Sequence, residues 1–225
     1  MAEKRTAGRS GKAEQTRAGI VEAALRLFGA GGYDATTMRA IADEAGVSLG
    51  STYYYFSGKE ELVQAFYDQI QVEHAAAAQA AYDRPAFADR LRGVLESFVD
   101  VAEPFHEFGG QFFRNAADPR SPLSPFSAES APAREASTAL MRRVVEGSDL
   151  KVAPALREEL PELLWLMHMG VVLFWVYDDS PGQRRTRTLV AGVVPIVDRA
   201  ARLTRLPVVR GLVDDALGLV RSVRG

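Results

Sequence analysis

Residues 48–55 bring together side chains that can hydrogen-bond to the phosphates and base edges of a DNA duplex. The segment reads SLGSTYYY and carries six hydroxyl groups within eight residues. A hydroxyl group both donates and accepts hydrogen bonds, so it suits either kind of contact. Gly50 leaves room for a close approach to a phosphate backbone. The segment is therefore a candidate for a helix that contacts DNA.

The residues before this segment predict another short helix and a tight turn. Four apolar residues there fall at i, i+3, i+4 and i+7 and make one buried face: Met38, Ile41, Ala42 and Ala45. Thr36 or Thr37 can cap this helix, expected over 37–45, because a threonine hydroxyl accepts from unpaired backbone amides. Gly46 can leave the helix with positive φ, and Ser48 can cap the next helix. Two helices joined this way form a helix-turn-helix.

The region from Gln15 to Phe66 resembles the DNA-binding region of the TetR family of bacterial repressors. The segments that carry this resemblance are TRAGIVEAALRLFGAGGYDATT, MRAIADEAGVSLGSTYYYF and GKEELVQAF, about a quarter of the chain. The resemblance implies an all-helical subunit, a homodimer, a palindromic double-stranded DNA operator and a separate C-terminal domain for a small-molecule effector. It also implies a transcriptional regulator and not an enzyme.

The resemblance nominates the residues that contact DNA. Those expected at phosphates are Thr37, Ser48, Tyr53 and Lys59. Those expected nearer the base edges are Arg39, Leu49, Gly50, Ser51 and Tyr55. Arg39 can pair with guanine in bidentate fashion or remain a solvated arginine. Tyr54 is expected to pack inward.

Two positions depart from the pattern of the family. Gly58 stands where a Ser or Asn cap is common, and Ser57 with Glu60 can form a capping box instead, starting the helix one residue earlier. Leu49 is often polar in the family; a leucine touches a thymine methyl but cannot hydrogen-bond a base. The operator sequence therefore does not transfer from a relative.

Composition limits the kinds of site and the cellular setting. The chain has 225 residues and no cysteine, which excludes disulfides and thiolate metal ligands. Its three histidines are not at metal-ligand spacing, and no phosphate-binding glycine loop or nucleophile elbow stands out. We expect no metal, no cofactor and no enzyme activity. The N-terminus lacks the apolar segment of a secretory signal, and we expect a cytoplasmic protein.

Charge and helical periodicity give the expected domains. The net charge is −2, but residues 1–17 hold five basic and two acidic residues, a net charge of +3. Such an arm can bind phosphate or stay a solvated tail; we expect residues 1–12 to be disordered. Residues 13–57 would then form the DNA-binding domain and residues 58–225 the ligand-binding and dimerisation domain.

The fold class expected from these patterns is all-α, a three-helix N-terminal unit followed by a C-terminal helical bundle. Beyond the helix-turn-helix, the expected helices cover about 13–30, 59–82, 85–101, 104–117, 133–146, 154–177, 183–203 and 207–223. Four prolines in residues 118–132 predict a loop, and Pro195 predicts a kink or break in its helix.

Aromatic residues concentrate on three of the C-terminal helices and predict an apolar ligand chamber. Its candidate residues are Phe98, Phe105, Phe108, Phe112, Phe113, Trp165, His168, Met169 and Phe174. A mostly apolar pocket with a few polar groups is typical of small-molecule sites, although each aromatic alone is equally a core residue. Gly109-Gly110 can bend the helix expected over 104–117.

The helices expected at about 154–178 and 183–204 carry apolar residues on more than one face. Stripes run through Leu156, Leu160, Leu163, Met167, Val171 and Phe174, and through Leu189, Val193, Ile196, Val197, Ala200 and Leu203. In the family that the chain resembles, these two helices form the homodimer interface. The apolar run 160–177 is expected to be a buried helix and not a membrane span.

Together these features predict a ligand-responsive DNA-binding regulator. The expected form is a repressor that binds a palindromic operator as a dimer and is released by a small apolar or aromatic ligand. The alternative is an activator or a weakly specific DNA binder with little ligand control.

Overall fold

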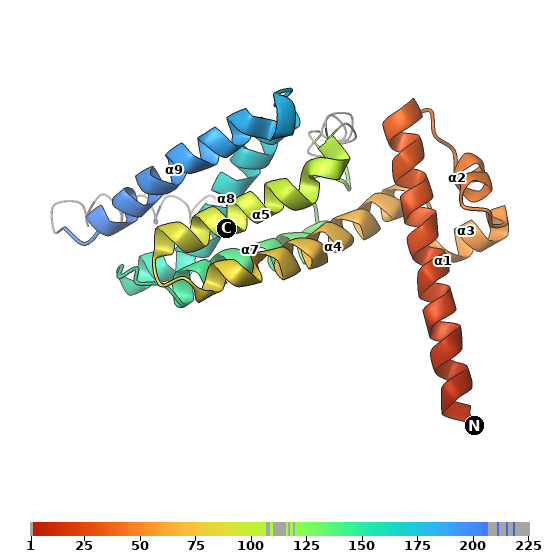
Figure 1. The fold of residues 1–225 in the computed structure, drawn as a ribbon, viewed down its shortest axis with the longest axis horizontal. Helices are drawn as coiled ribbons and strands as arrows, with labels where there is room; N and C mark the ends of the chain where they lie inside the picture. The colour runs from red at the N-terminus through yellow and green to blue at the C-terminus, as the bar shows by residue number, and fades with distance from the viewer. Residues whose placement is uncertain are drawn as a thin grey trace. The chain divides into compact units, whose positions relative to one another are not determined.

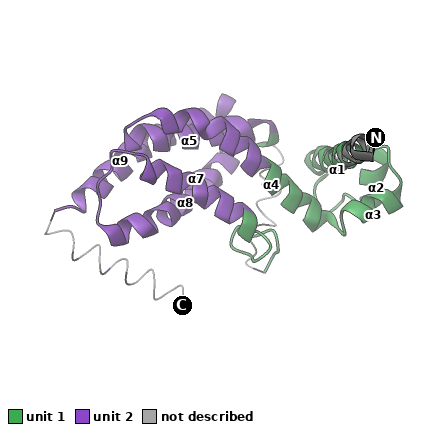
Figure 2. Cartoon of the chain, turned by 90° about the horizontal axis from the view of Figure 1, so that it is seen from below, with its two compact units in different colours: residues 1–69, 105–132 green, residues 70–104, 133–225 purple. Residues whose placement is uncertain are grey.

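A computed structural model describes residues 2–106 and 120–206, with the single positions 109, 116, 118, 211, 215 and 218. For residues 2–10 it describes the backbone alone. The described residues form helices joined by turns, with no strand among them (Figure 1). Residues 1–69 with 105–132 make one compact unit, unit 1, and residues 70–104 with 133–225 make unit 2 (Figure 2). The predicted all-α class, with a helix-turn-helix followed by a helical C-terminal part, is confirmed.

Unit 1 holds the helix-turn-helix against a long first helix. α1 (Ala2–Gly31) contacts α2 (Met38–Glu44), and α2 contacts α3 (Leu49–Tyr55). Their buried apolar side chains are Ile20, Val21, Ala23, Ala24, Phe28, Met38, Ile41, Ala42 and Phe56. The helical spacing of the apolar residues in α2 therefore places three of the four predicted side chains in the core, while Ala45 is half-buried.

α1 begins earlier than the sequence predicts. A disordered arm over residues 1–12 was the expectation, whereas the helix already includes residues 2–12. No proline interrupts this stretch, and its alanine, lysine, arginine and glutamate residues favour a helix. The domain boundaries after residues 12 and 57 remain predictions.

α4 (Lys59–Ala77) contributes to both units, with the division after Gln69. The backbone N and the Oγ of Ser57 donate to Glu61 Oε2 at 2.6 and 2.9 Å, and these bonds hold the pKa of Glu61 below its usual range. The predicted pairing of Ser57 with Glu60 is wrong, because the carboxylate one residue further along reaches back instead. α4 is also shorter than expected: Ala78–Asp83 form a 3₁₀ helix, η1, which buries Tyr82.

In unit 1, α4 holds the proline-rich loop that follows the undescribed segment. Gln64 Nε2 donates to Pro122 O at 2.8 Å, and Tyr67 Oη donates to Leu123 O at 3.1 Å. The loop consists of turns up to Ala131, where α7 (Ala131–Glu146) begins. The predicted loop is therefore confirmed over its described part, although α7 starts two residues earlier than expected.

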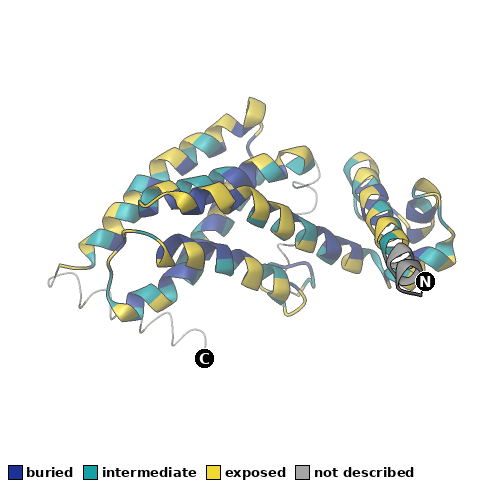
Figure 3. Cartoon of the chain, turned by 60° about the horizontal axis from the view of Figure 1, so that its bottom comes forward, coloured by how far each residue is buried: buried dark blue, intermediate teal, exposed yellow. Residues whose placement is uncertain are grey.

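Unit 2 is built from α5 (Phe87–Ala102), α7, α8 (Pro154–Val176) and α9 (Arg184–Leu203), with η1. α5 contacts both η1 and α9, and α8 contacts α9. Figure 3 shows buried residues recurring along one side of these helices. The core they enclose includes Tyr82, Phe87, Leu91, Val94, Leu95, Met141, Val144, Leu150, Leu164, Trp165, Val171, Val190 and Val194. The apolar periodicity of α5 thus identifies the face that packs inward.

α5 does not begin with Pro85 in its first turn, as the sequence predicts, but at Phe87. The carboxylate of Asp149 explains the difference, because its Oδ1 accepts from Phe87 N at 2.9 Å while Asp149 N donates to Pro85 O. Arg202 Nη2 of α9 donates to both oxygens of the same carboxylate, at 3.0 and 2.9 Å. The start of α5 is therefore fixed by residues far away in sequence.

Other expected helix features have mixed outcomes. Glu103–Phe105 form a 3₁₀ turn, η2, but most of the helix expected over 104–117 and of that over 207–223 lies outside the described residues. Pro195 lies inside α9, which continues without a break to Leu203. Proline removes one backbone donor but leaves the other hydrogen bonds of the helix in place.

α8 is long and apolar enough to cross a bilayer by length and composition. It is the one helix among the described residues that meets this criterion, which core helices of water-soluble proteins also meet. Its residues Leu160, Leu164 and Val171 belong to the core of unit 2. This packing supports the expected buried helix.

Asp178 connects the end of α8 to the start of α9. Its buried carboxylate accepts from the backbone N and the Oγ of Ser180 at 3.0 and 2.6 Å, and from the N and the Oγ1 of Thr186 at 2.7 and 2.8 Å. Burial alone would raise the pKa of Asp178, but these four hydrogen bonds hold the pKa well below its usual range. Asp178 thus caps the first turn of α9 through the backbone N of Thr186.

Replacing Asp178 by asparagine is expected to lower the free energy of unfolding by about 2 kcal/mol at pH 7, because a charge-assisted cap is lost. The pKa is lower in the folded state, so this stabilisation is fully present above the unfolded pKa of about 4. It is lost progressively as the pH falls from there through the lowered pKa of the folded state. Denaturant unfolding at pH 7 and at pH 3 measures both effects. Asp179→Asn is the matched control, since that exposed neighbour has only an ion pair with Arg185; an equal loss in both variants would contradict the prediction.

Candidate functional site

The helix-turn-helix is closed by the two caps that its sequence predicts. Thr37 Oγ1 accepts from Ala40 N at 3.1 Å, and Ser48 Oγ accepts from Ser51 N at 3.0 Å. Thr36 is not the cap; its hydroxyl donates to Gly32 O instead. The turn has Gly46 at φ 66°, in the left-handed region where glycine has no steric penalty. The two capping hydroxyls each keep a proton that can be donated to a phosphate.

One face of α3 is open to solvent. Thr52 and Phe56, one turn apart, are buried against unit 1. On the other side Gly50 is exposed, the side chain of Tyr53 is 52% exposed and that of Tyr54 is 81% exposed. The expectation that Tyr54 packs inward is wrong, because the burial of Thr52 and Phe56 turns Tyr54 outward on a 3.6-residue helix. The spacing of Thr52 and Phe56 is the sequence signal that could have identified Tyr54 as an outward-facing residue.

The other predicted DNA contacts lie around this face. Arg39 of α2 and Thr37, which caps α2, are exposed. Leu49, Ser51 and Tyr55 are half-buried at the edges of α3. Tyr54 and Tyr55 make an edge-to-face contact at a centroid distance of 5.1 Å. The surface offered to a duplex is thus mostly hydroxyl and aromatic, with one guanidinium from α2.

Lys59 is engaged within its own unit. Its Nζ donates to Tyr33 O at 2.7 Å and lies 4.4 Å from the centroid of the Tyr33 ring. Tyr33 Oη donates to Glu60 Oε1 at 3.1 Å, and burial together with this carboxylate raises the pKa of Tyr33. Lys59 therefore joins the start of α4 to the segment between α1 and α2, and its predicted phosphate contact remains a prediction.

Lys59→Met is expected to lower the free energy of unfolding by about 1 to 2 kcal/mol, because it removes a charged donor to a backbone carbonyl. DNA affinity should also fall, since α4 would no longer hold the segment before α2. Thermal unfolding and DNA binding of the same preparation measure the two effects. Lys151→Met, at an exposed lysine of unit 2, is the control. A loss of DNA affinity with unchanged unfolding would instead identify Lys59 as a phosphate contact alone.

Unit 2 contains a buried cluster of aromatic and imidazole rings. His168 and Trp175 of α8, Phe98 of α5 and His74 of α4 are all less than a tenth exposed. The Phe98 ring lies 4.6 Å from the ring of His168, 5.6 Å from that of His74 and 6.1 Å from that of Trp175, centroid to centroid. The two histidine rings are 5.9 Å apart. These four residues form the imidazole cluster.

The imidazole cluster contains only part of the predicted ligand chamber. Phe98 and His168 belong to it, while Trp165 lies in the core of unit 2 and Met169 packs against that core. Phe105 pairs with Phe66 in unit 1 at 4.8 Å, and Phe108, Phe112 and Phe113 lie outside the described residues. The sequence missed His74 as a member, although it continues the buried face of α4 four residues after Ile70.

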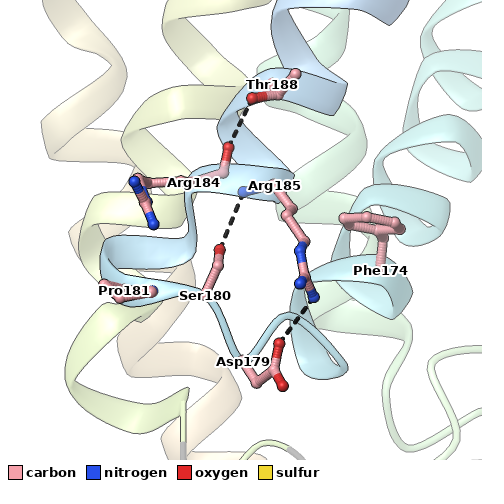
Figure 4. A pocket seen from close by; sticks show the side chains of 7 residues that line it. All are labelled: Phe174, Asp179, Ser180, Pro181, Arg184, Arg185 and Thr188. Carbon is pink, nitrogen blue, oxygen red and sulfur yellow. Dashed lines mark hydrogen bonds and ion pairs between the residues drawn. The ribbon is translucent and has the colours of Figure 1, made fainter.

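Phe174 is not part of the chamber. Its side chain is 41% exposed, because one residue before Trp175 corresponds to about 100° around α8. It lines an open surface pocket of about 690 Å³ with Asp179, Ser180, Pro181, Arg184, Arg185 and Thr188 (Figure 4). There Arg185 pairs with Asp179 at 2.8 Å, and Ser180 Oγ accepts from the backbone N of Arg185. This pocket is polar and open, unlike the expected apolar chamber.

Among the described residues, no three histidine, aspartate or glutamate side chains lie close enough together to hold a metal ion.

Burial lowers the pKa of His74, although its bond to Val94 O opposes this effect. Burial, followed by the charge of His74, lowers the pKa of His168 to about 3. Both rings are therefore neutral near pH 7.

Comparison with known proteins assigns both parts of the chain. The family model described as tetracyclin repressor-like, C-terminal domain, matches residues 90–219, and that described as bacterial regulatory proteins, tetR family, matches residues 20–66. The HTH-type transcriptional regulator TtgR of Pseudomonas putida is 44% identical over 70 residues, 31% of this chain and 33% of TtgR. UidR of Escherichia coli is 32% identical over 100 residues, 44% of this chain and 48% of UidR. The chain thus matches a third to a half of these relatives.

Solved structures share the fold at low sequence identity. A TetR transcriptional regulator from Nitrosomonas europaea is 20% identical with a TM-score of 0.62, covering 80% of this chain and 96% of that one. A TetR-family regulator from Syntrophomonas wolfei is 14% identical with a TM-score of 0.64, covering 82% and 95%. One family model covers more than half of the chain and the other covers its helix-turn-helix, so the protein belongs to the TetR family of bacterial transcriptional regulators, which bind DNA and are not enzymes.

Proposed function

We propose that the protein is a ligand-responsive repressor that binds a palindromic operator as a homodimer in the cytoplasm. The observation that supports this most is the open face of α3, where Gly50, Tyr53 and Tyr54 project from a helix capped by Ser48. In a dimer, two such helices would enter successive major grooves about 34 to 36 Å apart. The other predicted DNA contacts, from Arg39 to Lys59, would flank them.

The proposed dimer forms through α8 and α9. Large apolar side chains remain exposed on both helices: Leu166, Leu173 and Phe174 on α8, Tyr177 directly after α8, and Ile196 and Leu203 on α9. Several large apolar side chains exposed on two neighbouring helices are typical of an interaction site. The sequence predicts Leu163 and Met167 on the apolar stripe of α8 that forms the interface, but both are half-buried. Leu166, three residues after Leu163, is exposed instead.

The proposed effector binds in unit 2, and α4 carries the response because it belongs to both units. A ligand can release DNA only if it prefers the arrangement that does not fit the operator. The proposal therefore requires lower operator affinity at saturating ligand while the dimer persists.

Selection from a random pool of DNA duplexes at moderate salt tests the proposal. We expect a short palindromic sequence to be enriched, with an affinity that exceeds binding to random DNA by a factor of about 1,000 or more. Sequence-independent binding with the same salt dependence would instead support a weakly specific DNA binder. No preference for any duplex would overturn the proposed repressor.

A further inference from the structure

The imidazole cluster contains buried polar atoms that have no hydrogen-bond partner. His74 Nε2 lies 2.8 Å from Val94 O of α5, and because a carbonyl oxygen only accepts, this nitrogen carries the ring proton. His74 Nδ1 is then an acceptor in the neutral ring. It is buried without a hydrogen-bond partner, and so is His168 Nδ1. The tautomer of His168 decides whether its Nδ1 accepts or donates. Gln71 Oε1, one turn before His74 on α4, is a second buried acceptor without a partner.

Such atoms need an explanation, because a buried polar atom without a partner costs about 1 to 3 kcal/mol. His74 Nδ1 and His168 Nδ1 belong to rings that pack against the ring of Phe98, so these polar atoms lie within an otherwise aromatic cluster. Small-molecule sites have this composition. A ligand that donates hydrogen bonds would satisfy the acceptors and pack its body on the rings.

The surroundings also limit the charge of that ligand. The rings of His74 and His168 contact Phe98 and each other. An anion would need a positive partner in this buried place, and both imidazoles resist protonation because burial disfavours their charged form. A charged group of either sign would lose its hydration at this buried place, and an uncharged ligand avoids this cost.

We propose that the imidazole cluster, with Gln71, is the recognition end of the effector site and selects an uncharged apolar or aromatic molecule bearing at least one hydroxyl or N–H donor. The inference rests on the proposed ligand response and specifies the chemical class of its effector. The polar surface pocket of Figure 4 is the competing location in unit 2.

Three probes of similar size test this class on the full chain: phenol, toluene and benzoate. Both tryptophans of the chain lie on α8, and Trp175 is in the cluster, so tryptophan fluorescence reports binding. In the native protein, phenol should bind at least about tenfold more tightly than benzoate. In His74→Leu and in His168→Leu, the ratio of the phenol and toluene dissociation constants should rise by about tenfold, the value of one hydrogen bond.

Two further variants locate the effect. His168→Asn keeps a polar atom near the position of Nδ1 and should restore most of the phenol preference, which separates hydrogen bonding from damage to packing. Arg184→Ala alters the exposed pocket of Figure 4 and should leave both ratios unchanged. Benzoate binding as tight as that of phenol, an unchanged ratio in both leucine variants, or no saturable binding of any probe would overturn the inference.

DNA binding of the same preparations separates this inference from the proposed function. If the protein selects an operator but binds none of the probes, the proposed DNA-binding regulator is supported and the proposed effector class is rejected. The expected probe binding without any preferred duplex would reject the repressor and retain the ligand site.

Discussion

Replacing Tyr53 and Tyr54 together by alanine is expected to weaken binding to the selected operator by about a hundredfold. These are the most exposed side chains of α3, at 52% and 81%, and neither is needed to bury the core of unit 1. Two lost contacts of about 1.4 kcal/mol each correspond to that factor. Fluorescence anisotropy with the operator and with a scrambled duplex measures the loss and its sequence dependence.

The single variants show how much each tyrosine contributes to operator affinity, and they test whether Tyr54 faces outward. Tyr54→Ala alone should cost about tenfold, whereas a Tyr54 that packed inward would affect unfolding and not DNA. Phe126→Ala is the matched control, because Phe126 is also an exposed aromatic of unit 1, at 64%, but belongs to the proline-rich loop. Unchanged operator affinity in the double variant would remove α3 as the DNA-reading helix.

Local sequence signals predicted the helix-turn-helix well, because its structure is determined locally. The caps at Thr37 and Ser48 and the glycine turn at Gly46 each depend on neighbours within four residues. The side of α3 that faces solvent was harder to predict, because three consecutive tyrosines show no alternation of polar and apolar residues that would mark the buried side. Only the burial of Thr52 and Phe56 shows which tyrosines face outward.

Features fixed by distant residues could not be predicted in the same way. α5 begins at Phe87 because of Asp149, and Lys59 is engaged by the carbonyl of Tyr33. The aromatic chamber was predicted from aromatic residues concentrated on three helices and from the family resemblance. Neither distinguishes the buried Trp175 from its exposed neighbour Phe174. His74 was missed because a lone histidine within an alanine-rich helix has no local signal of what it contacts.

Introducing aspartate at Leu173 and Ile196 is expected to break the dimer and, with it, operator binding. Both side chains are exposed and apolar, at 42% and 58%, on two helices that contact each other. In the proposed interface each carboxylate would be buried without a partner, at a cost of at least about 2 kcal/mol. The dimer dissociation constant should therefore rise by about a thousandfold or more. Sedimentation velocity measures the association, and anisotropy measures operator binding.

The control for this prediction is Val72→Asp, because Val72 is an equally apolar residue of unit 2, 71% exposed on α4, outside the proposed interface. This variant should remain dimeric and bind the operator. In the monomer both replaced side chains are exposed, so their replacement should change the free energy of unfolding of the subunit little. Thermal unfolding of the double variant at low concentration should therefore show a folded subunit. A double variant that stays dimeric would place the interface elsewhere, and one that binds the operator as a monomer would contradict the need for two helices in successive grooves.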